Sequence, residues 1–280
     1  MVARLRAAGC VFAEEEADLL LEPGPDEAGL EAAVRRREAG EPLEQILGWA
    51  GFAGLRLAVE PGVFVPRRRT ELLARAAVDA LPARRGPVVV DLCCGVGAVA
   101  AVVLRARPDC VVHAVDVDPA AVRCAVRNLP GAVVHLGDLT APLPPGLRGQ
   151  VDVVTANAPY VPSGELDLMP REARLHEHPV ALDGGPDGLD VQRRVAQEAA
   201  SWLTTGGRLL VETSEHQHDA TAALLRDAGF EVSFVRPGVS AGGGPAWEQD
   251  GVDTDDEEGD GTVVVIGTRR PDPVPDHARA

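Results

Sequence analysis

Short runs of β-branched residues alternate with helix-spaced apolar residues from residue 87 onward. Runs of this length, bounded by Gly, Pro and Asp, are typical of buried strands, and the intervening segments show the periodicity of amphipathic helices. The alternation predicts an α/β domain in which a mostly parallel sheet carries helices on both faces. We expect strands over 88–92, 111–117, 133–136, 151–155 and 208–212, and helices over 99–107, 119–128, 190–203 and 216–228.

The pattern changes near the end of the chain. Residues 231–235 and 262–268 are two successive strand patterns with no helical pattern between them, which predicts an antiparallel hairpin at the edge of the sheet. The intervening stretch, 238–261, is rich in Gly and, from Glu248, in Asp and Glu, so it is predicted to be a disordered acidic surface loop. Residues 271–280 contain several prolines and are predicted to be a loose tail.

The first 48 residues are predicted to form a small helical subdomain of about three helices. One of them is expected to begin at the N-cap Asp26 and to end at Gly40. Residues 49–69 are predicted to form a β-hairpin linker, because alternating apolar residues are interrupted by glycines. The α/β domain would then span 70–270, opening with a helix that Thr70 caps and that runs to about Leu81.

Composition and charge restrict the classes of function. The chain of 280 residues has 45% hydrophobic residues, enough for a large core, and a formal net charge of −16. Such a charge argues against direct binding of DNA, which requires a cationic surface. No secretory apolar region follows Met1, and no apolar run is long enough to span a bilayer, so a cytoplasmic protein without a membrane partner is expected.

The strand over 151–155 runs directly into Asn157-Ala158-Pro159-Tyr160. In open α/β sheets, ligands bind beyond the carboxyl ends of the strands. An amide, two backbone carbonyls and an aromatic ring at this place suit a planar substrate that carries N–H groups. The alternative interpretation is an ordinary turn that ends the strand, since Asn and Pro are common in turns.

A second candidate site follows the first strand of the sheet. Gly95 and Gly97 lie between this strand and a helix, where glycine lets the backbone approach a ligand. Acidic residues end three successive strands, and a carboxylate at the second strand end typically binds ribose hydroxyls. Gly95-x-Gly97-x-x-Ala100 also satisfies the dinucleotide pattern, but three acids favour S-adenosylmethionine (SAM) over NAD. The three acids are Asp91, which is placed to meet the cationic methionine end, Asp116 for the ribose and Asp138 for an adenine N–H.

Each of these acids also has a purely structural interpretation. Asp116 would cap the following helix, although Asp118 is better placed for that role. Asp138 would hydrogen-bond the backbone of its own loop. Two His-x-His pairs lack a nearby third ligand, and the five cysteines include no C-x-x-C pair, so no metal site is expected. Cys93-Cys94 is expected to pack beside the loop rather than to act as a nucleophile.

Five segments resemble the HemK/PrmC-type family of protein-glutamine N5-methyltransferases, which has the Rossmann-like class I SAM-dependent fold with a seven-stranded sheet. They cover about residues 40–230 in the family's order. Two of these segments depart from the family at one position each: the cofactor loop has Cys93 where the family has Gly, and the catalytic motif has Ala158 where the family has Pro. The matched segments are Gly40-Glu41-Pro42-Leu43 with Gly48 and Phe52, Phe64 to Glu71, Asp91 to Ala98, Asn157 to Tyr160, and Gly206-Gly207-Arg208 to Glu212.

The resemblance implies transfer of a methyl group from SAM to the side-chain amide nitrogen of a glutamine in a protein. The implied partner is a release factor or ribosomal protein with an exposed glutamine loop. The implied catalytic residues are Asn157, Ala158, Pro159 and Tyr160; the implied cofactor residues are Asp91, Cys93, Gly95, Gly97, Asp116, Asp138 and Asn157; and Arg67 and Glu71 are implied on the substrate side.

Three other functions stay open at this point. The same chemistry would suit a small molecule or nucleobase amine, since the Asn-x-Pro-Tyr arrangement fits other planar nitrogens. The departures at Cys93 and Ala158 would also fit a SAM-binding protein that has lost its activity. An NAD-dependent oxidoreductase is disfavoured by the motif at 157–160.

Overall fold

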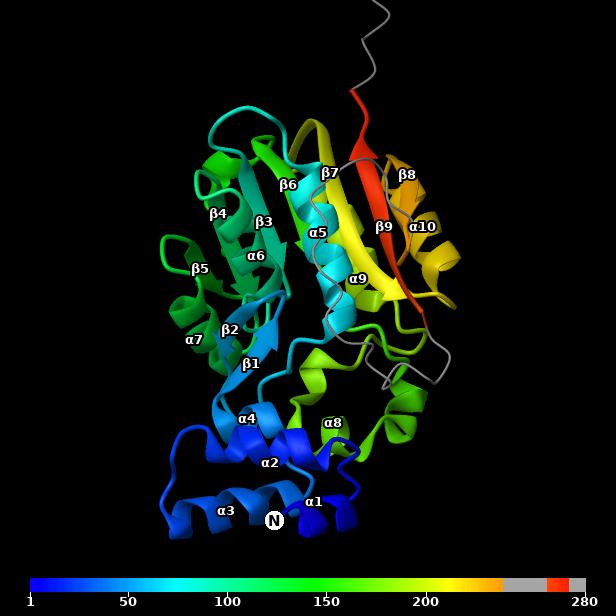
Figure 1. Cartoon of the computed structure of the whole chain (residues 1–280). Coiled ribbons are helices and arrows are strands. Elements are labelled where there is room, and N and C mark those ends of the chain that lie inside the picture. The colour runs from blue at the N-terminus through cyan, green and yellow to red at the C-terminus, as the bar shows by residue number, and fades with distance from the viewer. Residues whose placement is uncertain (239–260, 272–280) are drawn as a thin grey trace, which may run out of the picture.

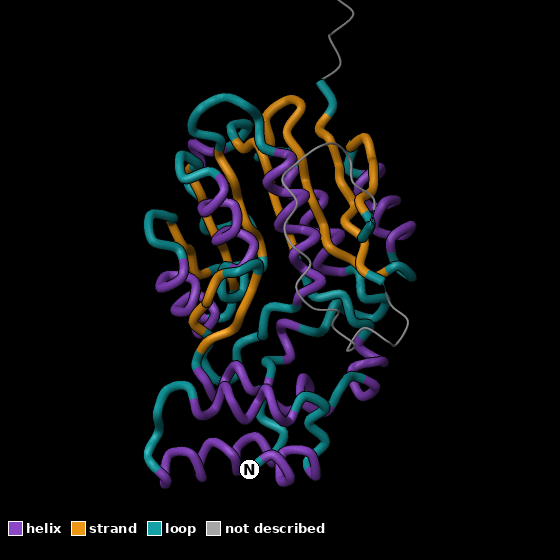
Figure 2. Tube along the Cα trace, viewed as in Figure 1, coloured by secondary structure: helices purple, strands orange, loops and turns teal. Residues whose placement is uncertain are grey.

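A seven-stranded sheet forms the middle layer of the molecule, with helices on both of its faces (Figure 1, Figure 2). The computed structural model describes residues 1–238 and 261–271. The strand order is β5-β4-β3-β6-β7-β9-β8. The first five strands pair in parallel, and β9 pairs antiparallel with both β7 and β8. The strands are β3 (Val88–Leu92), β4 (Val111–Asp116), β5 (Val133–Leu136), β6 (Val151–Ala156), β7 (Leu203–Ser214), β8 (Phe230–Val235) and β9 (Thr262–Arg269).

Each face of the sheet has its own apolar core, because successive side chains of a strand point to opposite faces. Val89 and Val153 belong to the core under one set of helices, whereas Val90 and Val154 belong to the other core. The first core also contains residues of α5 (Glu71–Ala80), α6 (Ala98–Ala106) and α7 (Pro119–Asn128), and the second contains residues of α9 (Asp190–Ala199) and α10 (His218–Asp227).

The alternating and terminal strand patterns are confirmed, including the antiparallel C-terminal hairpin. Two boundaries inside the domain differ from the prediction. The helix expected over 190–203 ends at Ala199, because Trp202 turns into the core and is 3% exposed. The strand expected over 208–212 begins at Leu203 and accommodates a register irregularity opposite Val151. The predicted acidic loop and tail fall almost entirely on 239–260 and 272–280, outside the described residues.

Four helices rather than three form the N-terminal part. They pack around a separate small core that includes Leu5, Ala17, Leu20 and Val34. The predicted cap at Asp26 is confirmed, since its carboxylate accepts a hydrogen bond from the Gly29 N–H at 2.8 Å. The short helix after Pro42 has no predicted counterpart, because five residues give too little periodicity. The helices are α1 (Val2–Ala7), α2 (Ala13–Leu21), α3 (Glu27–Glu38) and α4 (Leu43–Leu47).

The linker hairpin is shorter than predicted. It consists of β1 (Trp49–Phe52) and β2 (Leu55–Ala58), and residues 59–67 continue without a strand. The Asn128 side chain at the end of α7 pairs with the backbone of Ala58 through two hydrogen bonds, with Oδ1 accepting at 2.8 Å and Nδ2 donating at 3.0 Å. These bonds fix the hairpin on the α/β domain.

The helix predicted to begin at Thr70 begins one residue later, after the short 3-10 helix η1 (Arg68–Thr70). Thr70 has helical dihedral angles, and its hydroxyl makes no cap hydrogen bond. The capping prediction was wrong because the hydroxyl binds a buried side chain far away in the sequence. Three short helices between β6 and α9 had no predicted counterpart: η3 (Ser163–Leu168), α8 (Arg171–His176) and η4 (Pro179–Ala181).

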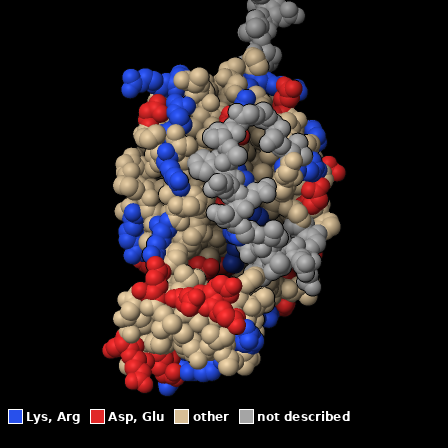
Figure 3. Space-filling model, in the orientation of Figure 1, with Lys and Arg blue, Asp and Glu red and all other residues tan. Residues whose placement is uncertain are grey.

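The carboxyl ends of β3 and β7 point toward the N-terminal helices (Figure 1). On the face shown in Figure 3, acidic side chains form a band along the N-terminal part where it meets the sheet domain. A cationic protein surface would complement such a band. Within residues 1–238 and 261–271, no helix combines the length and apolar character needed to cross a membrane.

The buried Gln45 of α4 joins the N-terminal part to two segments beside the sheet. Its Nε2 donates to the carbonyls of Val63 (2.9 Å) and His176 (3.0 Å), and its Oε1 accepts from the Gly62 N–H (3.1 Å). The side chain is 3% exposed, so water cannot readily replace these partners.

We predict that Gln45→Ala lowers the free energy of unfolding by about 2–4 kcal/mol, since buried backbone groups lose their partners. Chemical denaturation monitored by circular dichroism measures the change. Gln150→Ala is the matched control, because Gln150 is exposed and its substitution should change stability by less than about 0.5 kcal/mol. Equal effects of the two substitutions would contradict the prediction.

Candidate active site

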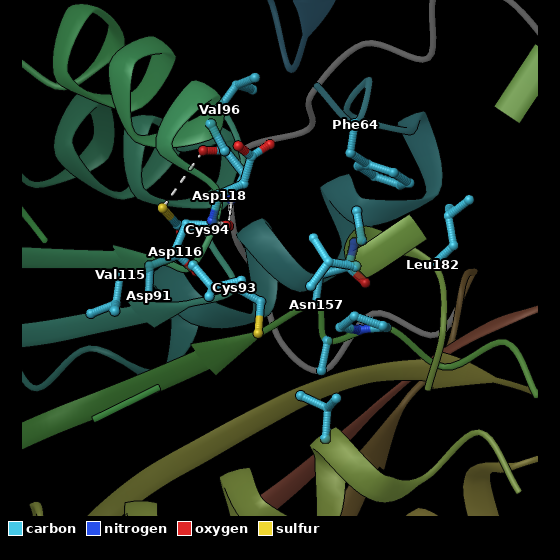
Figure 4. Close-up of a pocket in the computed structure, with 18 of the residues that line it drawn as sticks. Phe64, Asp91, Cys93, Cys94, Val96, Val115, Asp116, Asp118, Asn157 and Leu182 are labelled. Atoms are coloured by element: carbon cyan, nitrogen blue, oxygen red, sulfur yellow. Dashed lines mark hydrogen bonds between the residues drawn. The ribbon is translucent and has the colours of Figure 1, made fainter. Parts of the chain in front are cut away.

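A pocket of about 340 Å³ opens at the carboxyl ends of β3, β4 and β6. Figure 4 shows Asp91, Cys93 and Asp116 on one side of it and Asn157, Phe64 and Leu182 on the other. The structure therefore brings both candidate sites of the sequence into one cavity. Its lining includes Asp91, Cys93, Gly95, Asp116, Asp138, Asn157, Ala158, Pro159 and Tyr160, together with Phe64, Pro66, Arg69, Thr70, Met169 and Leu182.

The loop after β3 adopts the left-handed conformation at three positions. Cys93 has φ 53°, Gly95 φ 55° and Gly97 φ 83°. Cys93 therefore occupies a conformation that favours glycine, at a cost of about 1–2 kcal/mol. Gly97 also packs closely, because a Cβ there would lie 2.7 Å from a methyl group of Leu129, which explains the glycine by packing as well as by conformation.

Asp91 is the penultimate residue of β3 and lines the pocket. One oxygen accepts the Thr155 hydroxyl at 2.7 Å, and the other accepts the Ala100 N–H at 3.3 Å. Burial raises its pKa from 3.8 to about 7, because desolvation outweighs these two hydrogen bonds. The carboxyl is thus a group whose charge a cationic ligand would stabilise.

Asp116 and Asp138 occupy the next two strand ends, as predicted. Asp116 accepts the N–H groups of Gly95 (2.8 Å) and Asp118 (2.9 Å), and burial raises its pKa. It therefore shapes the Gly95 turn in addition to facing the pocket. Asp118 is the cap of α7, so the capping alternative for Asp116 is wrong. Asp138 is exposed and pairs with Arg194 at 2.8 Å.

The motif at the end of β6 contributes polar groups to the opposite side of the pocket. The Asn157 Nδ2 donates to the Thr70 hydroxyl at 3.2 Å, and no hydrogen bond within the described residues reaches its Oδ1. Ala158 is 1% exposed. The Tyr160 hydroxyl accepts a hydrogen bond from Arg69 at 2.8 Å. Amide and aromatic groups thus face a cavity whose other side is acidic.

Thr70 and Glu212 are site residues that the sequence reasoning did not assign. Thr70 donates its hydroxyl to Glu212 Oε1 at 3.1 Å. Glu212 lies on β7 beside the end of β6, since Val211 pairs with Ala156. The only sequence signal was that both residues belong to segments resembling the family, without a role attached to them.

A glycine-rich loop at 183–190 contacts the backbone of the motif and of the residue that follows it. The sequence pattern does not predict this contact. The Gly184 N–H donates to the Val161 carbonyl at 2.9 Å, and the Gln217 side chain donates to the Tyr160 carbonyl at 3.0 Å. A Cβ on Gly188 would lie 2.4 Å from the Tyr160 carbonyl oxygen. The three glycines between Asp183 and Asp190 were the available signal, because such close backbone contact requires glycine.

Arg67 and Glu71 lie outside the described lining of the pocket. Arg67 pairs with the buried Glu177 at 2.6 Å, and Glu71 accepts the Ala53 N–H at 3.0 Å. Both residues thus hold neighbouring segments in place, and their contact with a substrate stays a prediction.

The cysteines and histidines show no reactive arrangement in the described structure. Burial raises the pKa of Cys93 and Cys94, which disfavours thiolates. All five cysteines are free. Among residues 1–238 and 261–271, no group of three or more His, Cys, Asp or Glu is placed to hold a metal ion.

Comparison with solved structures identifies the class of the fold. A T. Thermophilus 16S rRNA N2 methyltransferase in complex with AdoMet and guanosine matches with a TM-score of 0.51 at 21% identity, over 79% of this chain and 50% of that one. A ribosomal protein L11 methylase from Lactobacillus delbrueckii subsp. bulgaricus matches with a TM-score of 0.50 at 14% identity, over 76% and 84%. The methyltransferase small domain model matches residues 54–183. The protein is a methyltransferase with the Rossmann-like class I SAM-dependent fold.

Sequence relatives identify the family within this class. A release factor glutamine methyltransferase of Mycolicibacterium smegmatis is 42% identical over 75% of both chains, and one of Deinococcus radiodurans is 34% identical over 85% of this chain and 91% of that protein. A 4-amino-L-phenylalanine/4-methylamino-L-phenylalanine methyltransferase of Streptomyces pristinaespiralis is 40% identical over 80% and 78%. The chain belongs to the release factor glutamine methyltransferase family, HemK/PrmC, which confirms the resemblance.

We predict that Gly188→Ala destabilises the protein more than Gly206→Ala. The two glycines have similar positive φ angles, 74° and 78°, but only Gly188 has neighbours within 4 Å of an added Cβ. Each substitution should lower the free energy of unfolding by about 1–2 kcal/mol because of the positive φ angle. Gly188→Ala should lower it further because the Tyr160 carbonyl must move. Urea denaturation of the two variants measures the difference. Equal losses would show that the contact at Gly188 relaxes freely.

Asp91 predicts a pH dependence of stability in the absence of ligand. Because its pKa rises from 3.8 unfolded to about 7 folded, the folded protein holds the extra proton between these values. The contribution of Asp91 to stability is therefore largest below pH 4 and decreases as the pH rises toward 7.

Urea denaturation at pH 5, 6, 7 and 8 tests this expectation. Asp91→Asn should make the decrease between pH 5 and 7 less steep than in the wild-type protein, because the variant has no carboxyl at this position to ionise. Asp79→Asn, on an exposed position of α5, is the control and should leave the profile unchanged. An Asp91→Asn profile as steep as that of the wild-type protein would refute the assignment.

Proposed function

We propose that this protein transfers a methyl group from SAM to the side-chain amide nitrogen of a glutamine in a protein substrate. The observation that carries the proposal is the orientation of Asn157. Its Nδ2 is engaged by Thr70, so its Oδ1 remains to accept an N–H from an acceptor in the pocket. Family membership supports the same acceptor, since two of the three relatives named above are release factor glutamine methyltransferases.

The chemistry requires the site to orient a weak nucleophile. The lone pair of an amide nitrogen is delocalised into its carbonyl, so the nitrogen must be aligned with the carbon that it attacks. Asn157 Oδ1 would accept one N–H of the glutamine amide, and the Ala158 carbonyl would accept the other. Both bonds increase electron density on the nitrogen and fix its direction, which are contributions of positioning and preorganised dipoles. Tyr160 would pack against the flat amide.

The acidic side of the pocket fits the cofactor by its chemistry. SAM supplies an electrophilic methyl group bonded to a sulfonium sulfur. This sulfur is the leaving group, and it needs no further activation because it already carries a positive charge. Asp91 would face its cationic amino-acid end, Asp116 would accept ribose hydroxyls, and Asp138 would accept an adenine N–H. The left-handed turn at Gly95, held by Asp116, leaves open space at the glycine, because a Cβ there would meet no atom within 4 Å.

A small aromatic amine is the second candidate acceptor. The relative from Streptomyces pristinaespiralis, which is named for 4-amino-L-phenylalanine, matches 80% of this chain. An arylamine nitrogen, like an amide nitrogen, is attached to a planar π system and carries two N–H groups. The same pair of acceptors, Asn157 Oδ1 and the Ala158 carbonyl, would bind it.

Incubation with SAM and each acceptor distinguishes the two candidates. We expect a bacterial release factor carrying its Gly-Gly-Gln loop to gain one methyl group, mapped to that glutamine by intact-mass and peptide analysis. Asn157→Ala should lower kcat by about 100-fold or more, because the nucleophile loses its orientation, while SAM affinity stays within about threefold. Gln150→Ala, at the amino end of β6, is the control and should retain full activity.

Each outcome has a separate meaning. Methylation of 4-amino-L-phenylalanine with no methyl on the release factor would replace the first candidate by the second. Confirmed SAM binding with no transfer to either acceptor would reject both, and would favour a SAM-binding protein without these activities. A fully active Asn157→Ala variant would reject the proposed role of Asn157.

A further inference from the structure

Glu212 is a buried carboxylate that neither the cofactor nor the acceptor is expected to touch. It is 1% exposed on β7, a central strand. Its Oε1 accepts the Thr70 hydroxyl at 3.1 Å and lies 3.9 Å from the Arg69 Nε. Its Oε2 is buried without a hydrogen-bond partner in the described structure. A buried and incompletely satisfied carboxylate is costly, so its position calls for a functional explanation.

The single hydrogen of the Thr70 hydroxyl gives these contacts a direction. An ionised carboxylate only accepts hydrogen bonds, so the hydroxyl must donate its hydrogen to Glu212. The Thr70 oxygen can then only accept from Asn157, and the group that donates to it must be the Nδ2 of the amide, at 3.2 Å. Thr70 is 4% exposed, which leaves little access for water to replace either partner.

We propose that Glu212 and Thr70 are positioning residues that fix the orientation of the Asn157 amide, so that its Oδ1 rather than its Nδ2 faces the acceptor. This inference rests on the proposed function of Asn157 as a hydrogen-bond acceptor for the methylated nitrogen. The opposite orientation would present N–H to N–H and repel the substrate.

Arg69 links Glu212 to Tyr160, at the other end of the motif. It donates to the Tyr160 hydroxyl at 2.8 Å and also approaches Glu212. Arg69 and Thr70 are neighbours in η1, so one buried carboxylate orders both residues that contact the motif from this side. The Phe64 to Glu71 segment and strand β7, which carries Glu212, therefore act together on the motif.

Protonation of Glu212 would reverse the direction of these bonds. Burial raises the pKa of Glu212 to about 7, with the Arg69 charge and the Thr70 hydrogen bond opposing the rise. From β9 the register partner of Glu212 is the apolar Val264, so η1 supplies the charge that faces it. A protonated Glu212 can donate to Thr70, which then donates to Asn157 Oδ1 and selects the inactive orientation. Activity should therefore rise as the pH increases through about 7.

Nuclear magnetic resonance can observe the amide without any turnover. The sequence has only two asparagines, Asn128 and Asn157, so protein labelled with 15N-asparagine gives two side-chain NH₂ pairs. Asn128 donates to Ala58 and Val96 carbonyls far from Glu212 in the sequence, and it serves as the internal control. The readouts are hydrogen exchange of each pair and its chemical shift between pH 6 and 8.

Paired variants separate the hydrogen-bonding role from a packing role. Thr70→Val removes the hydroxyl and Thr70→Ser retains it; Glu212→Leu removes the acceptor and Glu212→Gln retains it without a titrating proton. We expect Thr70→Val and Glu212→Leu to accelerate Asn157 NH₂ exchange by at least about tenfold and to lower kcat by roughly 10–100-fold, with SAM affinity unchanged. Thr70→Ser and Glu212→Gln should stay close to the wild-type protein, and Glu212→Gln should lose the pH-dependent shift of Asn157.

Hydrogen exchange of the Asn157 side-chain NH₂ tests the positioning role of Thr70 and Glu212 without requiring a known methyl acceptor. Unchanged Asn157 exchange in a folded Thr70→Val variant would overturn it, as would a Glu212→Gln variant that behaves like Glu212→Leu. If Glu212→Leu fails to fold, the Thr70 pair decides alone. If no acceptor is methylated while the amide responds as expected, the proposed function fails and the positioning of Asn157 stands. Residual pH dependence of activity in Glu212→Gln would be assigned to Asp91, whose pKa lies in the same range.

Discussion

A carboxylate excluded from water at the end of a central strand sets the arrangement of the site. Glu212 cannot lie there without polar partners. Its partners are the neighbouring residues Arg69 and Thr70, and Thr70 precedes Glu212 by 142 residues in the sequence. This requirement brings η1 against the sheet, where α5 then continues over β6 and β7. The same two side chains contact Asn157 and Tyr160. One desolvated charge thus joins segments that the sequence separates widely.

The fold was largely predictable where it depends on local periodicity. The parallel strands β3, β4 and β6 follow from apolar runs that are buried on both faces, and α7 follows from an Asp-Pro start with a capping carboxylate. The prediction was wrong where a residue distant in the sequence determines the local structure. Thr70 has the chemistry of an N-cap, but Glu212 takes its hydroxyl. The end of α9 depends on Trp202 entering the core, which the helical pattern does not reveal.

The sequence predicted the pocket residues that lie at strand ends, but it did not predict the residues that hold the motif in place. Asp91, Asp116 and Asn157 could be found because parallel strands bring their carboxyl ends to one edge. Gly188 packs against the Tyr160 carbonyl, and the Gln217 side chain donates a hydrogen bond to the same carbonyl. Contacts with backbone atoms leave little trace in a sequence except glycine itself. Cys93 shows the limit of that trace, since a residue other than glycine occupies a left-handed position in the cofactor loop.

The contacts behind the motif also bear on the alanine at position 158. Proline restrains a chain from within, by fixing φ through its ring. Here the Val161 and Tyr160 carbonyls are restrained from outside, by the Gly184 N–H and the Gln217 side chain. These two hydrogen bonds hold the backbone of the segment that follows Ala158. The backbone beyond position 158 is thus restrained by partners outside the motif, and these restraints do not require a proline ring at that position.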